Sequence, residues 1–127
     1  MPTMSARLDP WLKDSIEEFW RSHGEGPSTG LRRVAEEWWA MQNFSEITFV
    51  DGVAGRRARL RSGPDVWEVV SVHSDYGDDE EGFREHFAFV PPDALRQALE
   101  YAKIFPQEIH AMIENNRRVE RLVDSTR

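Results

Sequence analysis

The sequence contains no cysteine, which excludes a disulfide framework and thiolate chemistry. It also lacks any apolar run near the roughly 18 residues needed to cross a membrane, and its first residues do not follow a signal-peptide pattern. We therefore expect a soluble, cytoplasmic protein. The 127 residues are 39% hydrophobic, which is enough to bury a core in one ordinary domain or two very small ones.

An excess of positive charge is missing as well. The formal net charge is −7, which taken alone argues against a nucleic-acid binder. The acids are concentrated, however, because residues 76–91 contribute −4 of this charge. The remaining chain is therefore close to neutral, and a locally basic face is compatible with it.

Motifs for catalysis are also absent. The sequence has no P-loop and no GxGxxG, and its four histidines fall in no ligand spacing such as HExxH. Consecutive acids at 78–81 would point around a helix, so they do not converge on one ion. We expect a protein that is not an enzyme and that has no cofactor or metal site.

The first residues alternate in a way that predicts a strand over 3–8. Asp9 and Pro10 then favour a helix start, because Asp can cap free N–H groups and Pro suits the first helical position. After the "GEGPS" loop, Pro27 begins a second predicted helix that ends near residue 41. A lone strand would leave its backbone groups unpaired, so we expect its partner strand to come from a second copy of the chain.

The sequence pattern changes near Phe44 from helical spacing to strand-like runs. "EITFVDG" and "RRARLRSG" predict two strands joined by the turn "DGVAG". Helices are expected at about 65–75, 78–87 and 92–104, and a last helix from Pro106, with a polar tail from Asn115 that we expect to fray. The predicted fold class is mainly α with short β (α+β), in two parts, residues 1–44 and 45–127.

The strand, helix, Gly-containing loop and second helix of residues 1–44 resemble the ribbon-helix-helix repressors of the Arc, MetJ and CopG type. The resemblance implies a homodimer whose paired strands lie in the DNA major groove. The outward strand positions would then read bases, and the loop before the second helix would hold a DNA phosphate on free N–H groups. In this sequence the base-reading positions are Thr3, Ser5 and Arg7, the phosphate-binding positions are Gly26, Pro27, Ser28 and Thr29, and the inward positions are Met4, Ala6 and Leu8.

Residues 47–113 carry a second resemblance. The "GRRA" strand, the "GPDVWEVV" helix, an acidic helix and "ALRQALEYAKIFPQEI" resemble the uncharacterised domain family 433. Its members are similar to VapB-type antitoxins with a winged helix-turn-helix-like fold. The resemblance implies a regulator or antitoxin, whose partner would be a PIN-like toxin.

Arginines are densest at the second predicted strand, where Arg57, Arg59 and Arg61 share a face and Ala58 and Leu60 point to the core. These three arginines are candidate phosphate contacts. Two other interpretations stay open: a charged edge that prevents aggregation, and internal pairing with the acids at 78–81.

The predicted helices at 78–87 and 92–104 together resemble a helix-turn-helix, which is a weaker candidate for DNA reading. The predicted exposed face of helix 92–104 carries two acids that phosphates would repel, and we prefer a packing or interface role for it. That face comprises Asp93, Arg96, Gln97 and Glu100. Helical spacing predicts that the aromatics lie in the core or an interface, namely Trp11, Trp38, Trp39, Trp67, Phe83, Phe87 and Phe89.

These observations predict a homodimeric, DNA-binding transcriptional regulator of antitoxin type that reads operator DNA with an N-terminal β-ribbon. The alternative is a protein-binding antitoxin module that neutralises a PIN-like toxin nuclease, with the acidic run presented to a basic surface. The two functions are compatible in one chain.

Overall fold

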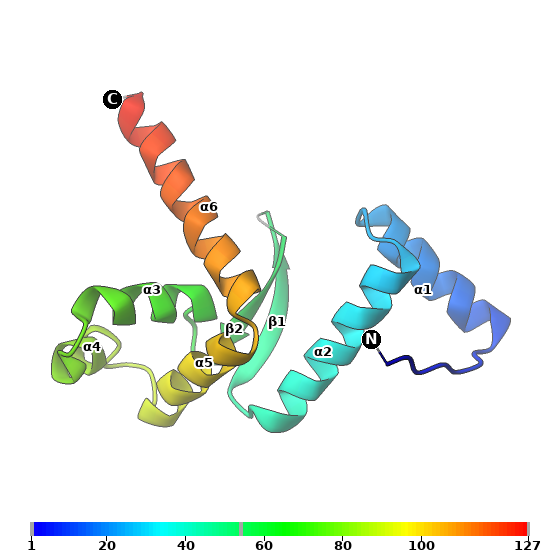
Figure 1. Cartoon of the computed structure of the whole chain (residues 1–127), viewed down its shortest axis with the longest axis horizontal. Helices are drawn as coiled ribbons and strands as arrows, with labels where there is room; N and C mark the ends of the chain where they lie inside the picture. The colour runs from blue at the N-terminus through cyan, green and yellow to red at the C-terminus, as the bar shows by residue number, and fades with distance from the viewer. Residues whose placement is uncertain (1, 54, 127) are drawn as a thin grey trace. The chain divides into compact units, whose positions relative to one another are not determined.

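The structure is a computed structural model that describes residues 2–53 and 55–126. These residues form six α-helices and one two-stranded antiparallel hairpin (Figure 1). The mainly helical α+β class expected from the sequence is confirmed at this level. The chain divides into two compact units, Met1–Trp39 and Ala40–Arg127, whose terminal residues Met1 and Arg127 lie outside the described ranges.

The first unit is built on two helices, α1 (Pro10–Ser22) and α2 (Pro27–Asn43). Both begin at a proline, as the sequence predicts, because the fixed φ of proline and its missing N–H suit the first helical turn. Asp9 occupies the N-cap position of α1, but its side chain makes no capping hydrogen bond, so this part of the expectation is wrong. Gly24 follows α1 with φ of 75°, a left-handed conformation that glycine adopts at low cost.

Residues 2–9 have no regular secondary structure in the single chain, and their side chains are exposed. The strand predicted at 3–8 is therefore not formed within one copy. An isolated strand has no neighbour to satisfy its backbone groups, so its formation would require a partner strand. Pairing with a second copy stays a prediction.

The second unit contains the hairpin of β1 (Ile47–Gly52) and β2 (Gly55–Leu60), which runs in register from Ile47 opposite Leu60 to Gly52 opposite Gly55. The turn lies where the sequence predicts it, although its residue Ala54 is outside the described ranges. Ala58 and Leu60 are buried, as the strand alternation predicts.

Four helices follow the hairpin: α3 (Val66–Tyr76), α4 (Glu80–His86), α5 (Pro92–Ile104) and α6 (Pro106–Ser125). Their positions agree with the predicted helices to within two residues, except at the C-terminus. The tail expected to fray from Asn115 is helical through Ser125. Side-chain contacts one turn apart support this segment, including Arg117 to Glu114 at 3.1 Å and Asn116 to Glu120 at 3.2 Å.

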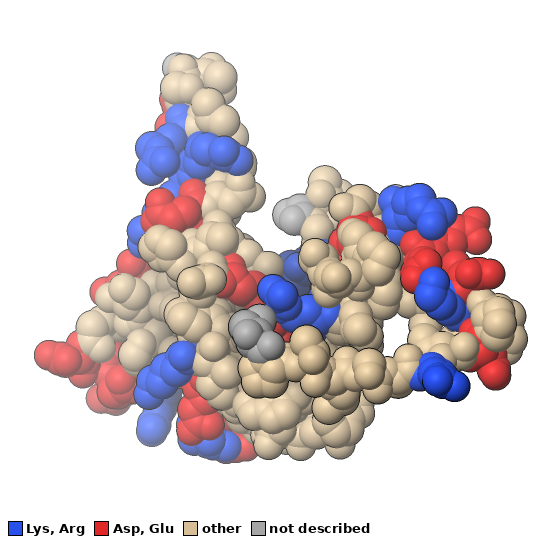
Figure 2. Space-filling view, turned by 45° about the vertical axis from the view of Figure 1, so that its right-hand side comes forward, with Lys and Arg blue, Asp and Glu red and all other residues tan. Residues whose placement is uncertain are grey.

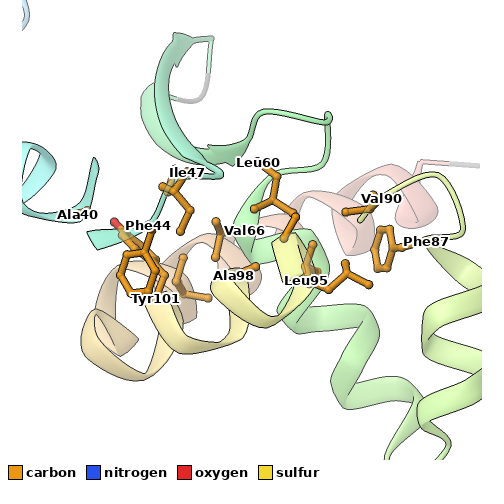
Figure 3. Close-up of a cluster of buried hydrophobic side chains, with 14 of the residues drawn as sticks. Ala40, Phe44, Ile47, Leu60, Val66, Phe87, Val90, Leu95, Ala98 and Tyr101 are labelled. Atoms are coloured by element: carbon orange, nitrogen blue, oxygen red, sulfur yellow. The ribbon is translucent and has the colours of Figure 1, made fainter. Parts of the chain in front are cut away.

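The core of the second unit lies where β1 and β2 meet α3 and α5 (Figure 3). Ile47, Leu60, Val66 and Val69 are its largest fully buried side chains. Phe44 belongs to the same cluster and contacts the ring of Tyr101 edge-on, with centroids 6.1 Å apart. The second unit therefore includes the end of α2, which supplies Ala40 and Asn43 as well as the chain that leads to Phe44.

Candidate nucleic-acid interface

The three predicted base-reading residues lie on the exposed segment that precedes α1. Thr3, Ser5 and Arg7 are all exposed. The alternate residues are exposed too, since Met4 is 95% accessible and Leu8 50%. One copy of the chain thus presents both sides of the segment to solvent, including the apolar side that a folded protein normally covers.

The predicted phosphate-binding residues lie at the N-terminus of α2. Gly26, Ser28 and Thr29 are exposed there. The Gly26 carbonyl already accepts the Gly30 N–H at 2.9 Å, which closes the first turn of the helix. A helix N-terminus carries free N–H groups and a partial positive charge, so this position suits a phosphate of a bound nucleic acid.

The close approach of Trp20 to Gly30 joins α1 to α2. Trp20 is the buried residue of α1, and a Cβ placed on Gly30 would collide with its indole ring. Glycine lowers helix propensity, which makes Gly30 look unfavourable in the sequence alone. In the structure the missing side chain provides the space that Trp20 occupies.

An ion-pair cluster adds a second connection within this unit. Arg33 donates from Nε and Nη2 to the Glu25 carboxylate, at 2.9 and 2.8 Å, and from Nη1 to Glu37 at 3.1 Å. The hydrogen bonds to Glu25, followed by those to Glu37, raise the pKa of Arg33 further above its ordinary value. Because Glu37 is buried, its pairing with Arg33 avoids an uncompensated charge.

The first unit leaves most of its large apolar side chains uncovered. Trp11 is 69% exposed and Trp38 61%, so neither lies in a core of the single chain, and the alternative of an interface position stays a prediction. Burial of large apolar side chains is the main stabilising term in folding. The other exposed apolar residues of this unit are Met4, Leu8, Phe19, Leu31, Val34 and Trp39.

The arginines of the hairpin have partners within their own unit. Arg57 Nε lies 2.6 Å from the Asp65 carboxylate, and Arg59 Nε donates to the Gly63 carbonyl at 2.7 Å. Arg61, which follows the end of β2, donates to the Ser45 carbonyl at 2.9 Å. These contacts support the structural interpretation of the three arginines more than the phosphate interpretation.

The acid that pairs with Arg57 was not the one considered from the sequence. Asp65 is 8% exposed and also accepts the Trp67 indole N–H at 3.1 Å. The internal pairing that the sequence leaves open is with the acids at 78–81, whereas Arg57 contacts Asp65. Asp65 stands five residues after the end of β2, in "GPDVW". The sequence signal for this cluster is an acid placed between a predicted strand and a helix whose first turn carries a tryptophan.

The α5 face differs from its expected exposure at Gln97 and, to a smaller extent, at Glu100, which is half-buried. Gln97 is buried, and it accepts the Glu46 N–H at 2.9 Å and donates to Asp93 at 2.9 Å. It therefore holds the start of the hairpin against α5 and is not available to a ligand. Asp93 and Arg96 are exposed as expected, and the hydrogen bond from Arg96, followed by that from Gln97, lowers the pKa of Asp93.

Two of the three phenylalanines predicted to lie in the core or an interface are in the core of the second unit. Phe83 and Phe87 are buried, with ring centroids 5.7 Å apart, as the spacing predicts. Phe89 is 70% exposed, because it lies between α4 and α5 and not on a packed helix face.

Charge is mixed on the face of the molecule that Figure 2 shows. On the face shown in Figure 2, basic and acidic side chains are interspersed, without one broad basic area. Within the described ranges, the His, Asp and Glu side chains form no group of three that could hold a metal ion. None of the helices described combines the length and hydropathy of a membrane span.

No family model, curated protein or solved structure matches this chain. The resemblances to ribbon-helix-helix repressors and to family 433 therefore stay predictions, and the functional argument depends on the chain's own residues.

Proposed function

We propose that the chain is a homodimeric DNA-binding transcriptional regulator of antitoxin type. The observation that carries the proposal is the exposed state of the first unit. Its N-terminal segment alternates polar and apolar side chains and has no strand partner in one copy, and α1 and α2 expose Trp11, Leu31, Val34 and Trp38. A second copy of the chain would supply the missing strand partner and would also cover the exposed apolar side chains.

In the proposed dimer, residues 3–8 of two chains pair as an antiparallel ribbon. Period-two alternation would then turn Met4, Ala6 and Leu8 toward the helices and leave the polar side chains outward. A two-stranded ribbon fits the major groove of B-DNA, where each base pair presents a distinct pattern of hydrogen-bonding groups.

The outward residues suit base contacts of different kinds. The Arg7 guanidinium can donate two hydrogen bonds to guanine, while the Thr3 and Ser5 hydroxyls can both donate and accept. The N-terminus of α2, at Gly26, Ser28 and Thr29, would hold a backbone phosphate and set the register of the ribbon. Binding at an operator would act by occupancy, by blocking polymerase.

The proposed role of the second unit is secondary. Its hairpin and helices would form the winged helix-turn-helix-like part, but the internal contacts of Arg57, Arg59 and Arg61 leave them a smaller share of any phosphate contact. Because the net charge is −7, we expect weak binding to random DNA and a steep dependence on salt.

The test is fluorescence anisotropy with DNA from upstream of the chain's own gene, against scrambled DNA, across roughly 50 to 200 mM salt. Wild type should prefer its own DNA, and Arg7→Ala should lose about 1–3 kcal/mol of that discrimination. Arg84→Ala, which removes an exposed arginine from the acidic helix α4, is the matched control and should leave the preference unchanged. Equal affinity of wild type for both DNAs at every salt concentration would refute the proposal.

A second candidate function is favoured by the surface around α4. Asp78, Asp79, Glu80 and Glu81 are exposed in and before the first turn of this helix. Such a surface suits a basic protein partner, here a PIN-like toxin nuclease. Titration of the purified chain with any PIN-like nuclease found encoded beside its gene tests this function, and an unchanged affinity in Glu80→Lys/Glu81→Lys would argue against it.

A further inference from the structure

The helix α6 is longer than the core it packs on. Its first half is held by Ile109, which is buried, and by Ile113, which packs on the core cluster of the unit. Figure 1 shows the C-terminal half of α6 extending beyond α3 and α5. That half would be expected to be polar all round if it faced only solvent.

The apolar face continues along the projecting half. Val119 is 48% exposed, Leu122 61% and Val123 46%. Together with Met112 and Asn116, the valines repeat at alternating spacings of three and four residues. This is the a and d spacing of a coiled-coil seam.

A groove lies at the base of the same face. Its volume is about 710 Å³, and it is lined by Arg57, Trp67, Met112, Asn115, Asn116 and Val119, among others. Met112 and Asn116 are half-buried there. The chain thus presents an uncovered apolar helix tip and, on the same helix, a groove beside its apolar base.

We propose that α6 pairs in antiparallel orientation with α6 of a second copy, so that each helix tip fills the groove at the base of the other. The helix itself gives the register. Pairing Met112 with Val123 of the partner subunit places Asn116 opposite Val119 of the partner subunit, while Ile113 and Leu122 flank the seam. Val119 and Val123 of each tip then meet Asn116 and Met112 at the base of the other helix.

The charges of α6 are compatible with a second copy as the occupant. Arg117, Arg118 and Arg121 are balanced by Glu114, Glu120 and Asp124, so two copies of this segment carry no net repulsion. A parallel pair would instead leave both grooves unfilled.

This contact is independent of the N-terminal ribbon, because it involves only residues of the second unit. Disulfide cross-linking tests it directly, since the chain has no cysteine of its own. We expect Met112→Cys/Val123→Cys to form a covalent dimer under mild oxidation. The two positions are about 16 Å apart along one helix, too far for a disulfide within one chain, which needs Cα atoms within about 7 Å.

Three controls make the result specific. Each single variant should stay uncross-linked, because its cysteine faces a valine or methionine and not its own counterpart. His110→Cys/Arg121→Cys has the same spacing on the exposed side of α6 and should also stay uncross-linked. Circular dichroism of each reduced variant checks that the helices are retained.

The outcomes separate this proposal from the DNA-binding proposal. Cross-linking of the double variant alone supports antiparallel pairing. Self-cross-linking of Val123→Cys would overturn the orientation, and equal cross-linking of the His110/Arg121 control, or no cross-linking in a chain that retains its helices, would overturn the contact. None of these results depends on whether Arg7→Ala changes DNA preference.

Discussion

Removal of the Asp65 carboxylate should separate the structural and DNA-binding roles of Arg57. In the structure Asp65 lies within 2.6 Å of Arg57 Nε and accepts the Trp67 indole N–H at 3.1 Å. The Asp65 side chain is 11% exposed and that of Arg57 27%. Asp65→Ala would therefore leave one charged and one neutral donor with reduced access to water.

The expected cost follows from these two hydrogen bonds. A charge-assisted bond contributes about 1.5–3 kcal/mol and a neutral one about 1 kcal/mol. Water can still reach part of the Arg57 guanidinium, so we take the lower half of this range, a total of about 3 kcal/mol. For a chain of this size that corresponds to a fall in Tm of about 10 °C.

The assay is urea unfolding followed by circular dichroism on Asp65→Ala, Arg57→Met and the double variant. If the pair is structural, the two single losses should overlap, with a coupling free energy of at least about 1 kcal/mol. Arg56→Met is the matched control, because Arg56 pairs at 3.0 Å with an exposed acid, Asp51, and such surface pairs contribute less than about 1 kcal/mol.

One combination of results would refute a structural role for the Arg57–Asp65 pair. If Arg57→Met left the free energy of unfolding unchanged but reduced the salt dependence of DNA binding, Arg57 would be a phosphate contact and its pairing with Asp65 would be incidental.

Three further changes test local features of the structure. Gly30→Ala should destabilise wild type by about 1–2 kcal/mol in urea unfolding, because overpacking against Trp20 outweighs the gain in helix propensity. In a Trp20→Leu background, which lacks the indole, the same change should stabilise the chain. Destabilisation in both backgrounds would contradict this explanation. Glu37→Gln should lower the free energy of unfolding by about 1–2 kcal/mol through its weakened bond to Arg33, again by urea unfolding. Because folding lowers the pKa of Asp93, its carboxylate stabilises the folded state at pH values above the ordinary pKa of 3.8. This contribution disappears as the pH falls through the lower folded-state pKa. The urea midpoints of wild type and Asp93→Asn should therefore differ near neutral pH and converge in acid, and a pH-independent difference would contradict the assignment.

Local sequence signals predicted most of the elements. Proline at the first turn located α1, α2 and α6, and two strand-like runs joined by a turn located the hairpin, because these signals act within a few residues. Contacts across the fold were less predictable. The partners of Arg57 and Gln97 depend on how β2, α3 and α5 pack, and the helical periodicity of α5 alone placed Gln97 on the wrong face.

The conformation of residues 3–8 could not be predicted from the sequence alone. Residues 3–8 have the alternation of a strand, but an alternating sequence specifies only which side chains share a face, and a strand also needs a neighbour. The candidate base-reading residues Thr3, Ser5 and Arg7 could therefore be identified by type and spacing, while their conformation depends on something that one chain does not supply.

The single buried residue of α1 has a consequence for abundance in the cell. A helical hairpin that is secured by Trp20 and one arginine cluster, with most of its other large apolar side chains exposed, has little folding free energy of its own. If a second copy supplies the rest, the folded fraction of this unit depends on protein concentration by mass action. Dilution after synthesis stops would then unfold α1 and expose it to proteases, so the lifetime of the protein would be coupled to its own expression level.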